Sequence, residues 1–381
     1  MVMSDLSEQP EKSIWLASGS RANAKAVYRM IANEKLTKES ILSAHRDAVS
    51  ERSAEEQVLL AVQDTMSVNY NGHTETKGLG YNCEQSLGKS FRWLETMEVA
   101  AQNAPAGVKL VHIADREGDI YELYAQALRM KESFVIRAAH KRLTTDKTPV
   151  LQSLRDSRPL GKTTVIIPDS HKNQTKEREA VLTVQVLNAD ILKPQIRRKA
   201  DELESSLPLT MIRLWEEFPS DGAEPVEWLL MTNIEVNGIK DAVRIAGYYK
   251  QRWKIERFHF VLKSGCKIEK IQQRSVDGIE LVILMYSIIA IHIMILTFLS
   301  RVAPKLSCDI ILSEAEWKTL HCAANRTRQE PEHPPPMKEA VRLIACLGGH
   351  VGAKSDGEPG LKVIWIGLNT LFTLVAYRDF L

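Results

Sequence analysis

The sequence predicts an α/β core that is interrupted by an all-β insertion and flanked by helical regions towards both ends of the chain. Two short apolar runs, 56–61 and 108–114, each lead into an aspartate and alternate with helical patterns, which is typical of a small parallel sheet. The segment 141–235 instead contains several β-rich runs separated by polar residues. A proline-free amphipathic stretch, 241–263, follows and predicts a single helix.

The elements of this core can be placed in order from their apolar runs and capping residues. Thr37 is a suitable N-cap for the second of two helices expected within 20–55. The two strands that close on Asp64 and Asp115 lie on either side of a helix, and parallel strands would bring both carboxylates to one edge of the sheet. The remaining expected elements are a helix at 91–102, a helix at 119–130 and a strand at 134–137.

Length and composition are those of a soluble globular protein with one large domain or two ordinary ones. The 381 residues are 44% hydrophobic and 26% charged, and the net charge of +2 means that any surface for nucleic acid must be local. Five cysteines without C-x-x-C spacing indicate a reducing cytoplasm rather than a disulfide scaffold or a zinc site. The uncharged run 281–299 is long enough to span a membrane, but it contains Ser287, His292 and Thr297. We therefore expect a helix buried on all sides in a soluble core, and no membrane partner.

The helix predicted at 241–263 carries four polar side chains in a stripe. At about 100° per residue, Tyr249, Arg252, Glu256 and Lys263 fall within an arc roughly 60° wide, away from the apolar face. A carboxylate between cations is a poor general base because the cations hold its pKa down. It suits a divalent metal beside an anionic substrate such as a phosphodiester. The alternative interpretation is a solvated face with ordinary ion pairs.

Three carboxylates can converge in this arrangement: Asp64, Asp115 and Glu256. Converging carboxylates stay ionised only beside cations, and two divalent ions roughly 4 Å apart would serve phosphoryl displacement. All-carboxylate ligation favours Mg²⁺, with Mn²⁺ as a substitute. For either aspartate alone, a simple strand-end or turn role remains the alternative.

Four stretches resemble the IS4-type DDE transposases close to the Tn5 transposase: QDTMSVNY, HIADREGDIYELY, EWLLMTN and YYKQRWKIERFHFVLKSGCKIEKIQ. The most specific is the signature Tyr249-x-x-Arg252-x-x-x-Glu256-x-x-x-x-x-x-Lys263, and the resemblance covers nearly the whole chain. It implies an RNase H-like catalytic fold split by a β insertion. It also implies cut-and-paste transposition, in which transposon ends are cut and joined to target DNA.

The resemblance assigns a role to each matched residue. Asp64, Asp115 and Glu256 would ligate Mg²⁺, and Tyr249, Arg252 and Lys263 would contact phosphates of the transposon end. Trp228 would stack on a base flipped out of the duplex, for which the alternative is a core residue of a strand. Arg137 would hold nearby DNA, since a guanidinium is a good phosphate partner.

The chain departs from the family pattern in two places. Only about a dozen residues precede the part that matches the family, so we expect an N-terminally truncated member. Asp64 and Asp115 are only 51 positions apart, without the two strands that the family places between them, so we expect an internal deletion that leaves the strand of Asp64 at a sheet edge. The expected segments are a helical remnant of a DNA-binding region (1–55), the first part of the core (56–140), the β-rich insertion (141–235), the catalytic and buried helices (236–300) and a helical protein-contact region (301–381).

These departures leave three hypotheses open. The leading one is a DDE transposase in a bacterial cytoplasm, associated with the nucleoid when bound to double-stranded DNA, at transposon ends and target. It would act as a homodimer on DNA or as a heterodimer with full-length transposase. The second is a non-catalytic inhibitor or dimerisation partner of full-length transposase, and the third is a stand-alone metal-dependent nuclease.

Overall fold

The chain folds into two compact units, a sheet unit and a helical unit. The computed structural model describes residues 25, 29–31, 33, 35–70, 72, 75–79, 87–167, 177–195, 203–219, 223–352 and 357–377. The sheet unit comprises residues 47–65 and 83–256, and the helical unit comprises residues 1–46, 66–82 and 257–381. Most of the helix expected near residue 20 lies outside the described residues, whereas α4 (Lys38–Ser53) is capped by Thr37, whose Oγ1 accepts from the N–H of Ser40.

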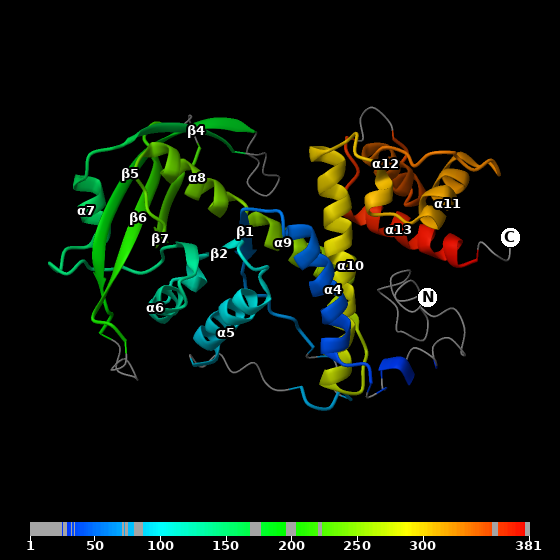
Figure 1. Cartoon of the computed structure of the whole chain (residues 1–381), viewed down its shortest axis with the longest axis horizontal. Helices are drawn as coiled ribbons and strands as arrows, with labels where there is room; N and C mark the ends of the chain where they lie inside the picture. Colours follow the sequence, from blue (N-terminus) through cyan, green and yellow to red (C-terminus); the bar gives the residue numbers. More distant parts are fainter. Residues whose placement is uncertain are drawn as a thin grey trace. The chain divides into compact units, whose positions relative to one another are not determined.

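One seven-stranded sheet organises the sheet unit (Figure 1). Its order is β1-β2-β3-β7-β6-β5-β4; the first three strands are parallel to one another and every other pairing is antiparallel. The strands are β1 (Val58–Val62), β2 (Lys109–Ala114), β3 (Ser133–Arg137), β4 (Gly161–Ile167), β5 (Arg178–Leu192), β6 (Ser206–Glu216) and β7 (Glu227–Thr232). As expected from the sequence, the strand before Asp64 is the edge strand of the sheet that the structure describes.

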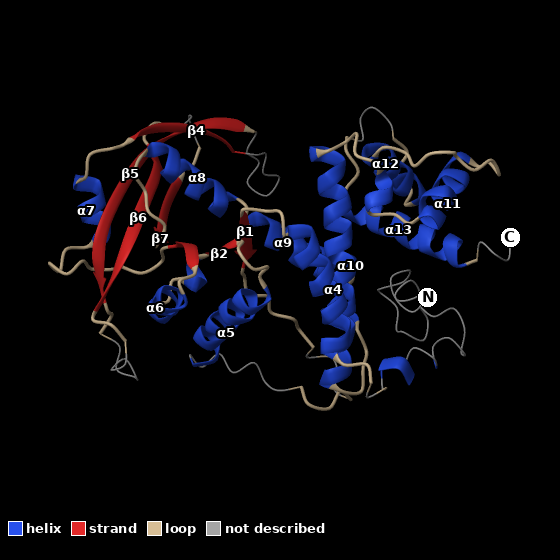
Figure 2. Ribbon diagram, in the orientation of Figure 1, coloured by secondary structure: helices blue, strands red, loops and turns tan. Residues whose placement is uncertain are grey.

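Helices cover both faces of this sheet because successive residues of the buried strands alternate between two cores (Figure 2). In β3, Phe134 and Ile136 belong to one core, whereas Val135 between them belongs to the other. The first core includes residues of α5 (Leu87–Asn103), α6 (Tyr121–Met130) and α7 (Val150–Asp156). The second includes residues of α8 (Ile239–Lys250). This is an α/β fold, as the sequence predicts.

The expectation of a separate all-β insertion at 141–235 is not confirmed. The segment contains α7, and β7 pairs with β3, so its four strands continue the sheet begun by β1–β3. The physical reason is that β3 has a free edge once β2 has paired on its other side, and an antiparallel strand satisfies those backbone groups.

The helical unit is built around one long apolar helix. Its described helices include α10 (Val276–Val302), α11 (Glu314–Asn325), α12 (Met337–Leu347), α13 (Leu361–Ala376) and the first part of α4, whose Ile41 packs against their core. They share one core, to which α10 contributes Met285, Tyr286 and Ile293 and α13 contributes Trp365 and Leu368. The unit also contains short 3-10 and π turns, η3 (Val261–Gly265), η4 (Ile268–Lys270) and η5 (Cys308–Ile310).

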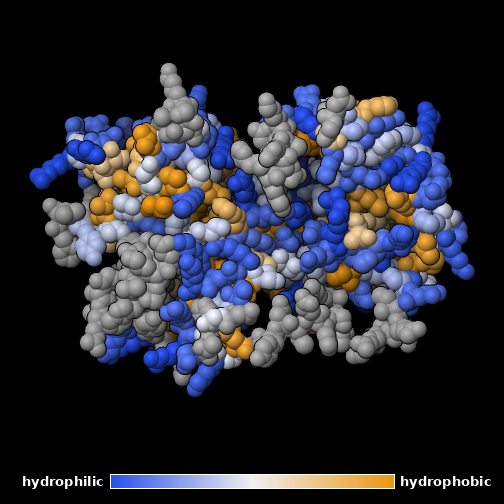
Figure 3. Space-filling view, turned by 180° about the vertical axis from the view of Figure 1, so that it is seen from behind, coloured by the Kyte–Doolittle hydropathy of each residue, from blue (hydrophilic) through white to orange (hydrophobic). Residues whose placement is uncertain are grey.

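The expectation that α10 is buried on all sides is wrong. By length and composition it is the one described helix that could cross a membrane, but only 44% of its most apolar window is buried. Phe298 is 46% exposed and Val302 is 64% exposed. One side of the helix therefore lies in the core, while other residues of it are exposed. On the face that Figure 3 draws, hydrophobic residues lie among hydrophilic ones.

Two glycines allow α12 and α13 to approach closely. A methyl group at Gly367 in α13 would lie 1.7 Å from the backbone oxygen of Ile344, and one at Gly348 would lie 2.1 Å from the backbone oxygen of Val363. Real contacts of a Cβ atom are much longer, so any other residue at either position must push the helices apart.

We therefore expect Gly367→Ala to destabilise the helical unit by about 1–3 kcal/mol, through overpacking of backbone against backbone. Urea unfolding followed by circular dichroism measures the change. Gly360, which caps the same helix and has nothing within 4 Å of its added methyl, is the matched control. Its alanine variant should change the free energy of unfolding by less than about 0.5 kcal/mol, and equal losses in both variants would contradict the close approach.

His112 makes the stability of the sheet unit sensitive to acid. It is 1% exposed in β2, with Nδ1 3.1 Å from Nε2 of Gln63 and Nε2 3.7 Å from Oε2 of Glu132, and burial lowers its pKa to about 4. The unfolded chain binds this proton near pH 6.5 but the folded chain does not, so stability is present above that pH and falls as pH drops from about 6.5 to 4. The free energy of unfolding contributed by this group should fall by about 3 kcal/mol over this range.

Between pH 7 and pH 4.5, the free energy of unfolding should fall less for His112→Gln than for the wild type, as measured by urea unfolding. The same fall in both proteins would rule out His112 as its cause.

Candidate active site

The parallel register of β1 and β2 brings the two predicted aspartates to corresponding positions. Val58 pairs with Lys109 and Val62 with Ile113, and the ladder continues with the N–H of Gln63 donating to the oxygen of Ile113 at 2.8 Å. Every pair differs by 51 positions, which is also the difference between residues 64 and 115. Adjacent strands lie about 4.8 Å apart. Asp64 and Asp115 therefore leave the carboxyl ends of neighbouring strands side by side.

The turns that carry these aspartates are tied to each other. Asp115 caps η1 (Arg116–Gly118), and its Oδ1 accepts from the N–H of Glu117 at 2.8 Å. On the other strand, Oδ1 of Asp64 accepts from the N–H of Thr65 at 2.8 Å. The hydroxyl of Thr65 donates to Oε2 of Glu117 at 2.6 Å, so a side-chain hydrogen bond joins the residues that follow each carboxylate.

The segment that carries Glu256 is not the single helix that the sequence predicts. It consists of α8, a turn at Gln251 and Arg252, α9 (Trp253–Phe260) and the π turn η3. At the break, N–H groups bond three residues back instead of four, as from Arg252 to Tyr249 and from Ile255 to Arg252. This tighter winding, and the wider winding of η3, change the angle per residue, so the constant 100° per residue behind the predicted four-residue stripe does not hold along this segment.

Arg252 at the break joins two of the three predicted carboxylates. Its Nη1 donates to Oδ2 of Asp64 at 3.4 Å, and its Nη2 donates to Oε1 of Glu256. Burial opposes the charge on Arg252, but the hydrogen bond to Glu256, with Tyr249 and Asp64 nearby, holds its pKa above the ordinary value. One guanidinium in contact with both carboxylates brings Glu256 into the neighbourhood of the paired aspartates.

Three of the residues predicted to bind DNA make contacts within the sheet unit: Tyr249, Trp228 and Arg137. Tyr249 is buried, with its ring 5.7 Å from that of Trp228 in an edge-on arrangement. Trp228, in β7, is half-buried and packs against the core that α8 covers. Arg137 ends β3, and its Nη2 donates to the backbone oxygen of Glu227 at 3.1 Å. These contacts fit the alternative interpretation of Trp228 as a packing residue, and they hold both aromatic side chains in place.

The fourth predicted DNA contact, Lys263, belongs to the helical unit. It lies in η3, where its ammonium is 3.5 Å from the carboxylate of Glu269. Its assignment to transposon-end phosphates therefore stays a prediction.

The donor set has the chemistry of a site for a hard divalent cation. Asp64, Asp115 and Glu256 offer carboxylate oxygens, which Mg²⁺ and Mn²⁺ prefer. The side chain of Glu256 is 58% exposed and that of Asp64 is 14% exposed, so the carboxylate of Glu256 has more freedom to reorient than that of Asp64. Among the described residues, no three histidine, cysteine, aspartate or glutamate side chains are already gathered as a metal-ion site.

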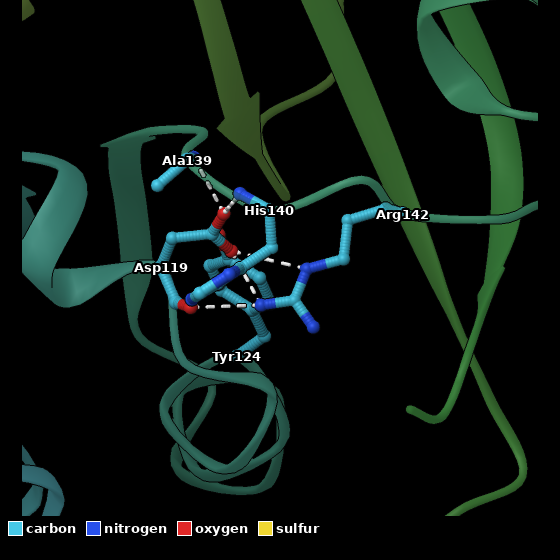
Figure 4. Close-up of polar contacts among 5 residues, drawn as sticks. All are labelled: Asp119, Tyr124, Ala139, His140 and Arg142. Atoms are coloured by element: carbon cyan, nitrogen blue, oxygen red, sulfur yellow. Dashed lines mark hydrogen bonds and ion pairs between the residues drawn. The ribbon is translucent and has the colours of Figure 1, made fainter. Parts of the chain in front are cut away.

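The structure contains a buried ion pair that the sequence did not predict, between Arg142 and Asp119 at the end of the turn that Asp115 caps. Asp119 and Arg142 lie in contact, with the hydroxyl of Tyr124 and two backbone N–H groups also directed at Asp119 (Figure 4). The only sequence signal is a second aspartate four residues after Asp115, and its partner is 23 residues further along the chain.

Two known protein families match parts of the chain. Residues 98–292 match the transposase DDE domain, and residues 288–379 match the transposase Tn5 dimerisation domain. The first match includes Asp115 and Glu256, whereas Asp64 lies before it. Because the DDE match covers just over half of the chain, the protein belongs to the DDE transposases, among those similar to Tn5 and the IS4 type.

Proposed function

We propose that this chain is a cut-and-paste DDE transposase that cleaves transposon ends and transfers them into target DNA with an RNase H-like catalytic core. The observation that carries the proposal is the β1–β2 register, which sets Asp64 beside Asp115, together with the contact of Arg252 with both Asp64 and Glu256. Three parallel strands with aspartates after the first two support the core assignment.

In this proposal Asp64, Asp115 and Glu256 hold Mg²⁺, or Mn²⁺ in its place. The bound metal would supply activation of a nucleophilic oxygen and stabilisation of charge on the phosphate. The protein's own contribution is alignment, since β1 and β2 fix two carboxylates and α9 supplies the third.

Arg252 is suited to contact a DNA phosphate when a transposon end binds. The side chain of its partner Glu256 is 58% exposed and can turn towards solvent, which would leave the guanidinium of Arg252 available to a phosphate. Lys263, Arg137 and Tyr249 are proposed as further phosphate contacts, and Trp228 as the stacking surface for a flipped base. The edge-on contact of Trp228 with Tyr249 would hold the indole in place for this role.

The match to the Tn5 dimerisation domain supports a dimer that associates with DNA. We propose a homodimer on double-stranded DNA at transposon ends and target, or a heterodimer with full-length transposase. The second candidate function, a non-catalytic partner of full-length transposase, is favoured by the same match and by the edge position of β1, which leaves the strand before Asp64 paired on one side only. Dimerisation without DNA cleavage would establish that second function.

Replacing any one of the three carboxylates should abolish DNA cleavage. Substitution of groups that only support a metal ligand reduces metal affinity or activity by 10- to 100-fold, so loss of a ligand should cost at least about 100-fold. Cleavage of DNA bearing the element's own ends, with Mg²⁺ or Mn²⁺, should therefore fall by this factor in Asp64→Asn, Asp115→Asn and Glu256→Gln. Glu95→Gln, at an exposed site on α5, is the control and should cleave as the wild type does. Cleavage that survives in all three variants would refute the assignment.

Arg252→Gln should weaken binding to transposon-end DNA and change its salt dependence. A phosphate contact releases about one counterion, so the slope of log K against log salt should become shallower by about one. Fluorescence anisotropy at several salt concentrations measures this slope. An unchanged slope, with only a loss of stability, would mean that Arg252 serves solely as the ion-pair partner of Asp64 and Glu256.

A further inference from the structure

A buried carboxylate lies at the end of the turn that carries Asp115. Asp119 follows η1 directly and is 1% exposed. Its Oδ2 accepts from the backbone N–H groups of Ala139 at 2.6 Å and His140 at 2.7 Å, and its Oδ1 accepts from the hydroxyl of Tyr124 at 2.8 Å and from Arg142 (Figure 4). A carboxylate has about four acceptor positions, and four donor groups occupy them. Asp119 therefore has no oxygen left for substrate or metal.

Arg142 holds both the side chain and the backbone of Asp119. Its Nε donates to Oδ1 at 3.1 Å, and its Nη2 donates to Oδ1 and, at 2.8 Å, to the backbone oxygen of Asp119. Burial alone would raise the pKa of Asp119, but Arg142 and the N–H groups of His140 and Ala139 hold it below its ordinary value. The pair is thus a charged one in the interior of the sheet unit.

A buried ion pair such as that of Asp119 and Arg142 is not explained by a gain in stability alone. Both charges lose their hydration when buried, and well-packed apolar residues are often as stable or more so. A guanidinium bound to a carboxylate fixes the relative orientation of the two groups, because its N–H groups have a fixed planar geometry. The donors to Asp119 come from residues 139–142, which follow β3, whereas Asp119 follows β2. The pair therefore fastens the turn after β2 to the chain after β3.

Between β2 and Asp119 the turn has little freedom to move. A methyl group at Gly118 would lie 2.6 Å from the Cβ of Ala114, so the turn is pressed against the end of its own strand. The N–H of Gly118 also donates to the oxygen of Asp115 at 3.2 Å. Asp115 is consequently held between a strand that is paired on both sides and the anchored Asp119.

We propose that Asp119 and Arg142 are positioning residues that fix the turn of Asp115 and so set the direction of its carboxylate towards a divalent cation. The inference rests on the proposed function, in which Asp115 is a metal ligand. Neither residue touches the metal or the DNA; both act through the backbone of η1.

Binding of Mn²⁺ to the full chain without DNA, measured by calorimetry, tests this role. Asp119→Asn keeps the size of the side chain but replaces one carboxylate oxygen by an amide N–H₂ group. Since both oxygens accept hydrogen bonds, this N–H₂ group would face other donors. Arg142→Lys keeps the charge and loses the planar fork. We expect each variant to bind Mn²⁺ about tenfold more weakly or worse, as for other groups that orient a metal ligand, with the circular dichroism spectrum of the wild type. Arg129→Lys is the control. Arg129, on α6, makes an exposed ion pair with Glu204 at 3.2 Å, and the Mn²⁺ affinity of this variant should stay within twofold of the wild type.

The outcomes separate the positioning role from the metal site itself. If Asp115→Asn abolishes Mn²⁺ binding while Asp119→Asn and Arg142→Lys stay within twofold of the wild type, the pair is structural only and the inference is overturned. If the wild type binds no Mn²⁺, or Asp115→Asn binds it unchanged, the proposed metal site is wrong and the inference falls with it. If Asp119→Asn does not fold, Arg142→Lys, which leaves both charges in place, decides by the same criterion.

Discussion

The hydrogen-bonded register between β1 and β2 is the constraint on which the candidate site depends. A shift of one residue along either strand would turn the side chain of one aspartate to the opposite face of the sheet. The register is held from the β2 side, because β2 is buried and paired with both β1 and β3. The edge strand β1 is held less completely, and the hydrogen bond between Thr65 and Glu117 adds a tie at the point where Asp64 emerges.

Two arginines, Arg252 and Arg142, form ion pairs with carboxylates of the sheet unit, and the two pairs differ in burial. Arg252 contacts Asp64, whose side chain is 14% exposed, and Glu256, whose side chain is 58% exposed, so one of its two partners borders solvent. Arg142 and Asp119 are buried together, and separating them would leave an unpaired charge in the interior. We therefore propose that the contacts of Arg252 can change when DNA binds, whereas the buried pair of Asp119 and Arg142 keeps the turn of Asp115 in place.

Local patterns predicted those parts of the site that local sequence determines. The strands before Asp64 and Asp115 follow from short apolar runs, and α4 begins where Thr37 can cap it. The break at Arg252 carries no proline or glycine, so periodicity alone extended the helix through it. The pairing of β7 with β3 and of Asp119 with Arg142 joins segments that are distant in sequence, and no local propensity specifies such partners. The exposed face of α10 was missed because uniform apolarity does not distinguish a fully buried helix from one with a single buried face.

A crystal structure of the whole chain with Mn²⁺ would locate the metal ions by their anomalous scattering. We expect anomalous peaks in contact with the carboxylates of Asp64, Asp115 and Glu256, with the two aspartates side by side at the ends of β1 and β2. Peaks bound elsewhere, or carboxylates more than about 10 Å apart and so unable to share a pair of metal ions, would contradict this expectation.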